Sequence, residues 1–301
     1  MVDWPGLLKW SLAQTDSTSP FQPCPMDFAT RLWLREALGS FAFHEKAKLQ
    51  RITAVLSTLE TGSDPEEQQL KEAILHELMS IIDNPDLAKS LINSGGVLHL
   101  IRCMLGSRYM SVRRLASQIF SSAVQNNLTV QGYAQSQGAL EGLMEAVSQE
   151  RDVQTKESFV SSLSALVRGE CEAVRRDFIR NNGLELLRDV ILCPVSLRIV
   201  KKSLLLTINL FYYDLIQPNL RIFEQAENLG FVPVLLSMEN HEDLEVRQMA
   251  IQALHNLGKR KAQGTQQITE GVEEWRRRLQ LMPDKAEELT LIEEILHTKE
   301  P

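Results

Sequence analysis

One short pattern occurs four times along this chain at nearly equal intervals: a polar residue, a glycine and then an apolar helix. The pattern occupies residues 93–101, 136–144, 181–187 and 228–236. Its glycines are Gly96, Gly138, Gly183 and Gly230, which are 42, 45 and 47 residues apart. Because glycine readily adopts a positive φ, each one is expected to end one helix and let the next begin. A chain with this periodicity is expected to fold as a stack of similar units.

A longer helix is predicted to follow each glycine, so that every unit contains three helices. These third helices are expected at 112–124, 153–167, 199–211 and 246–257. Composition favours helix as well: 45 residues are Leu, only 6% are aromatic, and Gly and Pro together make 26 of 301. A period of about 40–47 residues with two or three helices is typical of armadillo and HEAT repeats. We therefore predict an all-α, armadillo-like (ARM/HEAT) right-handed helical solenoid.

The rest of the chain is divided around these repeats. We expect an arm at 1–25, capping helices within 26–85, four armadillo-like repeats at 86–258 and C-terminal capping helices within 259–301. The N-terminal capping helices are predicted at 26–38, 45–59 and 65–82, and the C-terminal ones at 272–281 and 285–297. Terminal units of a solenoid need a polar outer surface because nothing stacks on them.

Several function classes lack support in the sequence. A net charge of −7 argues against nucleic acid or an anionic membrane as partner. No apolar run reaches the length of a membrane span, and residues 1–12 lack the features of a signal peptide. Four widely separated cysteines indicate free thiols in a reducing, cytoplasmic setting. No phosphate-binding, nucleophile or metal-ligand motif occurs, so we expect no enzyme activity, no cofactor and no metal.

Cations open each predicted third helix at the repeat period. They are Arg113, Arg114, Lys156, Lys201, Lys202 and Arg247. Cations near a helix N-terminus oppose the macrodipole at a cost of about 0.3–1 kcal/mol each, which suggests a function. We expect them to line the concave face and to bind an acidic partner. Alternatively, each cation pairs with local acids such as Asp152, Glu157, Asp243 or Glu245, or packs against the preceding unit.

Two further groups of residues are candidates for binding. Polar groups further along the third helices could bond a protein surface: Gln125, Asn126, Arg168, Asn209 and Asn256. The two asparagines at 209 and 256 could equally satisfy neighbouring backbone. In the arm, Leu7, Leu8, Trp10 and Leu12 precede a linker with three prolines, so this apolar segment either docks on a partner or folds back onto the first helices.

Several motifs, taken in order, resemble a known family. They are Leu-Leu-Lys-Trp-Ser-Leu at 7–12, Ile-Asp-Asn-Pro-Asp-Leu at 82–87, Val-Gln-Asn-Asn at 124–127, Val-Gln-Thr-Lys at 153–156 and Ser-Leu-Ser-Ala-Leu-Val-Arg at 162–168, with the tail 271–297. The chain is similar to the armadillo-type nucleotide exchange factors of the 70-kilodalton heat-shock (DnaK-type) chaperones, the Fes and heat-shock-binding-protein group.

The resemblance implies a non-enzymatic co-chaperone. Its concave face would grip one lobe of the chaperone's ATPase domain, open the nucleotide cleft and speed ADP release. Lys201 falls at a basic contact position of the family, Pro85 replaces the usual Ala of the 82–87 motif, and Asn84, Asp86 and Phe159 join the expected binding face. The arm would mimic substrate and help to release it. We expect a cytoplasmic monomer.

A second class of protein stays open as an alternative. An armadillo adaptor or scaffold of the nuclear-import-receptor type would capture an extended peptide. Such receptors carry Trp and Asn pairs on successive third helices, whereas Trp4, Trp10, Trp33 and Trp275 all lie outside the predicted repeats.

Overall fold

The computed structural model describes residues 28–60, 64–259, 265–280 and 292–293, and these residues are helical without a strand. Two helices, α2 (Phe28–Leu56) and α3 (Pro65–Met79), come first. Four units of three helices follow: α4 (Pro85–Asn93), α5 (Gly96–Gly106), α6 (Met110–Val124); α7 (Leu128–Ser136), α8 (Ala139–Gln149), α9 (Val153–Val167); α10 (Glu172–Arg180), α11 (Gly183–Leu192), α12 (Leu197–Ile216); α13 (Ile222–Asn228), α14 (Phe231–Leu236), α15 (Leu244–Lys259). A short 3-10 turn, η1 (Ser237–Asn240), links α14 to α15, and α16 (Thr265–Gln280) comes last. The predicted all-α repeat solenoid is confirmed.

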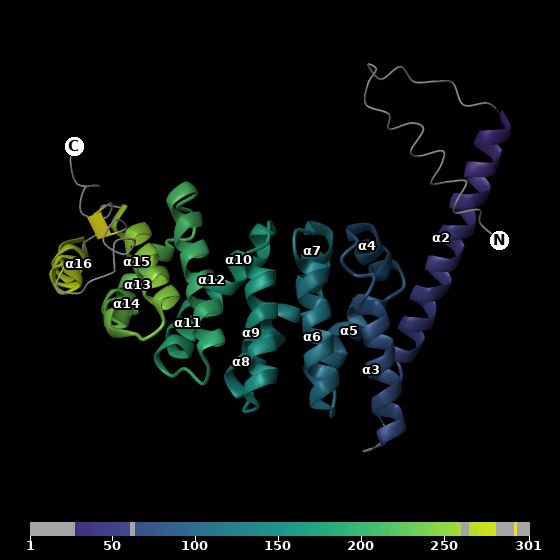
Figure 1. Ribbon diagram of the computed structural model, residues 1–301, viewed down its shortest axis with the longest axis horizontal. Coiled ribbons are helices and arrows are strands. Elements are labelled where there is room, and N and C mark those ends of the chain that lie inside the picture. The colour runs from purple at the N-terminus through teal and green to yellow at the C-terminus, as the bar shows by residue number, and fades with distance from the viewer. Residues whose placement is uncertain (1–27, 61–63, 260–264, 281–291, 294–301) are drawn as a thin grey trace.

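The third helices stand side by side in one row. Helix α3 packs on α6, α6 on α9, α9 on α12 and α12 on α15 (Figure 1). Their inner sides bury large apolar groups, among them Phe120, Phe159 and Phe211. Burying each such side chain stabilises the fold by about 1.5–3 kcal/mol. The outward side of this row, formed by α3, α6, α9, α12 and α15, is called the third-helix face below.

Small hydroxyl residues let neighbouring third helices approach closely. Between α6 and α9, the Ser117 and Ser162 hydroxyl oxygens are 2.6 Å apart, and the Ser162 hydroxyl also donates to the Ser117 carbonyl at 2.8 Å. Ser121 adds a third hydroxyl 3.0 Å from that of Ser162. Because buried hydroxyls must find partners, these bonds fix the register between two repeats as well as their distance.

The marker glycines serve two different purposes. Gly138 and Gly230 have positive φ, as predicted, but in the first and third units the left-handed residues are Gly95 and Asn182, one position earlier. Gly183 is required for space instead, since a Cβ there would lie 2.5 Å from the Phe178 ring. Gly96 is likewise crowded by the Leu91 side chain.

Some helix limits differ from the predictions. Residues 28–56 form one helix where two were expected, because Gly39 costs a helix only about 1 kcal/mol and no proline interrupts the segment. Helix α12 runs five residues further than expected, to Ile216, and α16 begins at Thr265 rather than 272. Most of the predicted helix 285–297 and the whole arm 1–25 lie outside the described residues.

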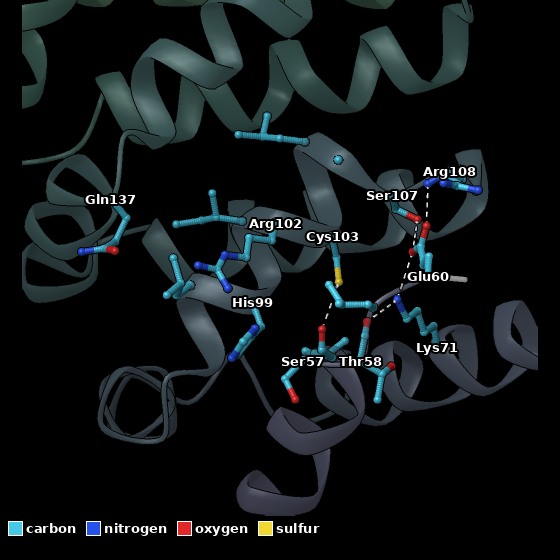
Figure 2. A pocket seen from close by; sticks show the side chains of 16 residues that line it. Ser57, Thr58, Glu60, Lys71, His99, Arg102, Cys103, Ser107, Arg108 and Gln137 are labelled. Atoms are coloured by element: carbon cyan, nitrogen blue, oxygen red, sulfur yellow. Dashed lines mark hydrogen bonds and ion pairs between the residues drawn. The ribbon is translucent and has the colours of Figure 1, made fainter. Parts of the chain in front are cut away.

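A buried ion pair joins the N-terminal cap to the first repeat beside a surface hollow of about 770 Å³ (Figure 2). Lys71 on α3 donates to Glu60 at 3.0 Å and to the Thr58 carbonyl at 3.1 Å. Glu60 also accepts from the Ser107 hydroxyl and the Arg108 amide, each at 2.7 Å. Burial alone would raise the pKa of Glu60, but these hydrogen bonds outweigh it and lower the pKa.

The crowding at Gly183 predicts an overpacked variant. Gly183→Ala forces a methyl group against the fully buried Phe178 ring and should cost about 1–3 kcal/mol, seen as a lower urea midpoint by circular dichroism. Gly132→Ala is the control: this helical glycine has no atom near its absent Cβ, so the midpoint should rise slightly. Equal behaviour of the two variants would contradict this account.

The Glu60–Lys71 pair predicts a loss of stability and a pH dependence. Lys71→Met leaves Glu60 without its cation and should cost about 3 kcal/mol. Since the folded pKa of Glu60 is lowered from 4.5, its contribution is present above pH 4.5 and is lost as the pH falls through the folded pKa. Urea midpoints should therefore show wild type exceeding Glu60→Gln at pH 7, with the gap closing below pH 4.5. A gap of constant size from pH 7 down through the acid range would exclude this role.

Candidate partner-binding face

Two of the six predicted cations, Arg113 and Lys201, pair with acids of the next repeat. Arg113 lies 2.6 Å from Glu150 in the next repeat, and Lys201 lies 2.9 Å from Asp243 and 2.6 Å from Glu245. The hydrogen bonds to Glu245 and Asp243 raise the pKa of Lys201, and the bond from Lys201 lowers that of Asp243. For Lys201 the structure therefore supports the alternative of pairing with acids nearby, and contact between repeats explains why these cations recur at the repeat period.

Arg247 also has an internal role. It is buried, and its guanidinium donates to the carbonyls of His241 at 2.6 Å and Glu242 at 3.2 Å, which fixes the turn before α15. Arg114, in contrast, is half-buried on the outward side of α6, where it donates to Gln154 of α9. Lys156 is half-buried in the first turn of α9.

A basic cluster lies on the third-helix face where α9 and α12 meet, and consists of Arg168, Arg198 and Lys202. Burial lowers the pKa of Lys202, and the positive charges of Arg168 and Arg198 lower it further. Burial also lowers the pKa of Arg168, whose guanidinium donates to the Ser164 carbonyl at 3.3 Å. Arg198 is exposed, and its closest acidic oxygen is that of Glu157 at 4.0 Å. The positive charges of Arg168 and Arg198 thus disfavour the charged form of Lys202, and an anionic partner would offset them.

Arg198 is the member of this cluster that the sequence reasoning missed. It precedes Lys202 by four residues on one helix, which places both side chains on the same side of α12. That spacing was the available signal, and the search for cations repeated in every unit passed over it because Arg198 has no counterpart in the other third helices.

A groove of about 380 Å³ crosses the third helices of three repeats beside this cluster. Its walls carry Arg114 and Gln118 from α6, Gln154 and Glu157 from α9, and Arg198 from α12. Ser111, Leu115 and Ser158 complete its lining, and of these eight side chains only that of Leu115 is apolar. The groove therefore suits the polar surface of a folded protein better than an apolar ligand.

Several residues predicted to bind a partner are not available for it. Phe159 is 1% exposed and belongs to the core, and Asn256 is 3% exposed and donates to the Ile208 carbonyl at 3.3 Å. Asn256 thus satisfies neighbouring backbone, one of the two roles expected for it. Asn209 is half-buried on the outward side of α12.

The remaining predicted residues lie at turns. Gln125 and Asn126 are exposed after α6, where Asn126 turns the chain with φ 55°. Asn84 caps α4 by accepting from the Asp86 amide at 3.0 Å, and the exposed Asp86 lies 3.8 Å from Lys89. Helix α4 is outside the row of third helices. Leu7, Leu8, Trp10 and Leu12 lie outside the described residues.

The described part of the chain contains no group of three or more His, Cys, Asp or Glu side chains able to hold a metal ion. No described helix is long and apolar enough to cross a membrane.

Comparison with solved structures defines the class of fold as an armadillo repeat solenoid. A computationally designed armadillo repeat protein for modular peptide recognition has a TM-score of 0.68 and 16% identity, covering 83% of this chain and 99% of its own. A designed armadillo repeat protein in complex with peptide (KR)4 has a TM-score of 0.65 and 17% identity, covering 83% of this chain and 98% of its own. At such identity these similarities show the fold alone.

Family models give a more specific result. Residues 87–229 match the SIL1/FES1/HPBP1 C-terminal domain, and residues 231–260 match a HEAT repeat. Residues 87–229 therefore form a domain of the SIL1/FES1/HPBP1 type, and the resemblance found in the motifs is confirmed. A comparison with curated protein sequences found no match.

Proposed function

We propose that this protein is a nucleotide exchange factor that binds the ATPase domain of a cytosolic 70-kilodalton heat-shock chaperone through its third-helix face. Family membership supports the partner. The observation that carries the proposal is the basic cluster of Arg168, Arg198 and Lys202 on the outward side of α9 and α12. It gives a chain with a net charge of −7 a local positive surface where α9 and α12 meet.

Exchange would follow from binding alone, without chemistry on this chain. If the third-helix face binds the opened ATPase domain more tightly than the closed, ADP-bound form, linkage requires that ADP binding weakens by the same factor. Each tenfold difference in affinity corresponds to about 1.4 kcal/mol. A stack of repeats with fixed register resists bending, so the partner rather than the solenoid changes shape.

The basic cluster would contribute in two ways. Long-range attraction speeds the encounter with an acidic surface, at the low ionic strength where screening is weak. In the complex, carboxylates beside Lys202 would relieve the repulsion from Arg168 and Arg198. Arg113 and Lys201 contribute indirectly, because they link the repeats that position this surface, and Arg247 fixes the turn before α15.

The proposal extends to the arm, the compartment and the assembly. Leu7, Leu8, Trp10 and Leu12 would imitate an extended apolar substrate and help to release it from the chaperone. Among the described residues, Cys103, Cys171 and Cys193 are free thiols, which supports a reducing compartment and hence the cytosol. The protein would act as a monomer.

The alternative of a peptide adaptor has less support. The designed armadillo protein described above was solved with a basic peptide, (KR)4. In the present chain the corresponding row of helices carries a basic cluster, which would repel such a peptide, and none of its repeats contains a Trp.

The function is tested by following release of a fluorescent ADP analogue from a cytosolic 70-kilodalton chaperone in a stopped-flow instrument. The wild-type protein should accelerate release. The triple variant Arg168→Glu, Arg198→Glu and Lys202→Glu should need at least tenfold more protein for the same effect. Lys201 is left intact because its reversal would break the contact with Asp243.

The matched control reverses three exposed cations on helices or turns outside the third-helix row, Arg102, Arg180 and Arg221. The change in net charge is the same, so release should stay near the wild-type rate. No acceleration by the wild-type protein would overturn the proposed function. Equal loss in both triple variants would show that net charge, rather than the basic cluster, matters.

A further inference from the structure

Helix α12 is longer than the other third helices and projects beyond them. It has 20 residues, against 15 in α6, 15 in α9 and 16 in α15. In Figure 1 its C-terminal end rises past the end of α9. The additional turn contains residues 212–216, called the α12 tip below.

The α12 tip is held firmly at its inner side. The Arg175 guanidinium carbon lies 3.7 Å from the centre of the Tyr213 ring, and Arg175, itself buried, donates to the Gly169 carbonyl at 2.7 Å. Asp214 is fully buried and accepts from the Phe223 amide at 3.2 Å. These contacts tie the tip to α10 and α13, so its outer side chains are presented on a rigid support.

The outer side of the tip is apolar and exposed. Tyr212 is 56% exposed and Ile216 is 61% exposed, and the two are neighbours one turn apart. Both continue a single stripe along α12 that comprises Arg198, Lys202, Leu205, Asn209, Tyr212 and Ile216, each three or four residues from the last. A rigid, exposed Tyr beside an aliphatic group has the composition of a binding hot spot.

We propose that Tyr212 and Ile216 insert into an apolar hollow of the same partner whose carboxylates contact the basic cluster. This inference rests on the proposed function and names the chemistry of its interface. Ten residues of helix separate Lys202 from Tyr212, so the hollow lies about 15 Å from the partner's carboxylates. Charge complementarity identifies the protein that contacts the α12 tip. An acidic partner surface that is centred on Lys202 and has the width of an ordinary protein–protein interface also covers the tip.

The basic end and the apolar end of this stripe along α12 then contribute differently to binding. The basic cluster attracts and roughly orients the partner, but charge at an exposed surface fixes no register. The α12 tip fixes it, since an apolar side chain gains free energy only where it is desolvated in a hollow of the right shape. The partner is thereby held in one position along the repeats.

The test compares binding kinetics at several salt concentrations, using immobilised chaperone ATPase domain. Tyr212→Ala with Ile216→Ala should raise the dissociation rate at least tenfold and leave the association rate and its salt dependence unchanged. Lys202→Glu should instead slow association and reduce the salt dependence. Tyr212→Phe keeps the ring and should dissociate within about threefold of wild type.

The matched control is Leu128→Ala with Leu192→Ala, which removes similarly exposed apolar groups, 52% and 50%, from α7 and α11. Its dissociation rate should equal that of wild type, and all variants should keep their helical circular dichroism. If the wild-type protein binds and accelerates exchange but the tip variant dissociates at the wild-type rate, this inference alone is overturned. The same holds if the dissociation rate rises equally in the control. No binding by wild type would overturn the proposed function and the inference with it.

Discussion

Packing between consecutive third helices is the interaction on which the rest of this structure depends. No unit can bury its apolar side alone, so each needs the next one along the row. Ser117 and Ser162 set the distance and register between α6 and α9, while Arg113 with Glu150 and Lys201 with Asp243 link the polar edges. Because consecutive third helices pack against each other at every step, the outward side of the row becomes one continuous surface.

In the proposed function, the partner contacts side chains that are not used in packing between repeats. Cations that bond the next repeat stabilise the stack of repeats. At the basic cluster, in contrast, the charges of Arg168 and Arg198 disfavour that of Lys202, which favours an anionic partner. The same division holds along α12, where Tyr213 and Asp214 anchor the last turn and Tyr212 and Ile216 face outward. Because a rigid scaffold of this kind rearranges little on binding, little of the binding free energy is lost to ordering its own surface.

The candidate site was less accessible to sequence reasoning than the fold. Periodicity indicated six cations as candidates for partner binding. A residue type that recurs in every unit, however, serves a need common to all units, and contact with the neighbouring unit is such a need. Arg113 and Lys201 follow that rule, whereas Arg247 fixes a turn within its own repeat. Arg198 and the α12 tip occur in a single repeat, so a search for repetition could not find them. Phe159 and Asn256 turned inward because helical phase differs by 100° per residue, and a small error in phase exchanges core for surface.

The sequence by itself determined the class of fold, because the glycine-marked period and the spacing of apolar residues leave a helical solenoid as the solution that buries them. Its motifs, taken in order, also indicated the resemblance that the match of residues 87–229 to the SIL1/FES1/HPBP1 C-terminal domain confirms. Only the tertiary structure decided which cations are used for packing, which residue takes the left-handed turn before α5 and α11, and how far α12 extends. The turns depend on crowding of Gly96 by Leu91 and of Gly183 by Phe178 once the helices are folded. The use of the cations depends on atoms some 40 residues apart in the chain that meet only when repeats stack, and local sequence carries no record of that meeting.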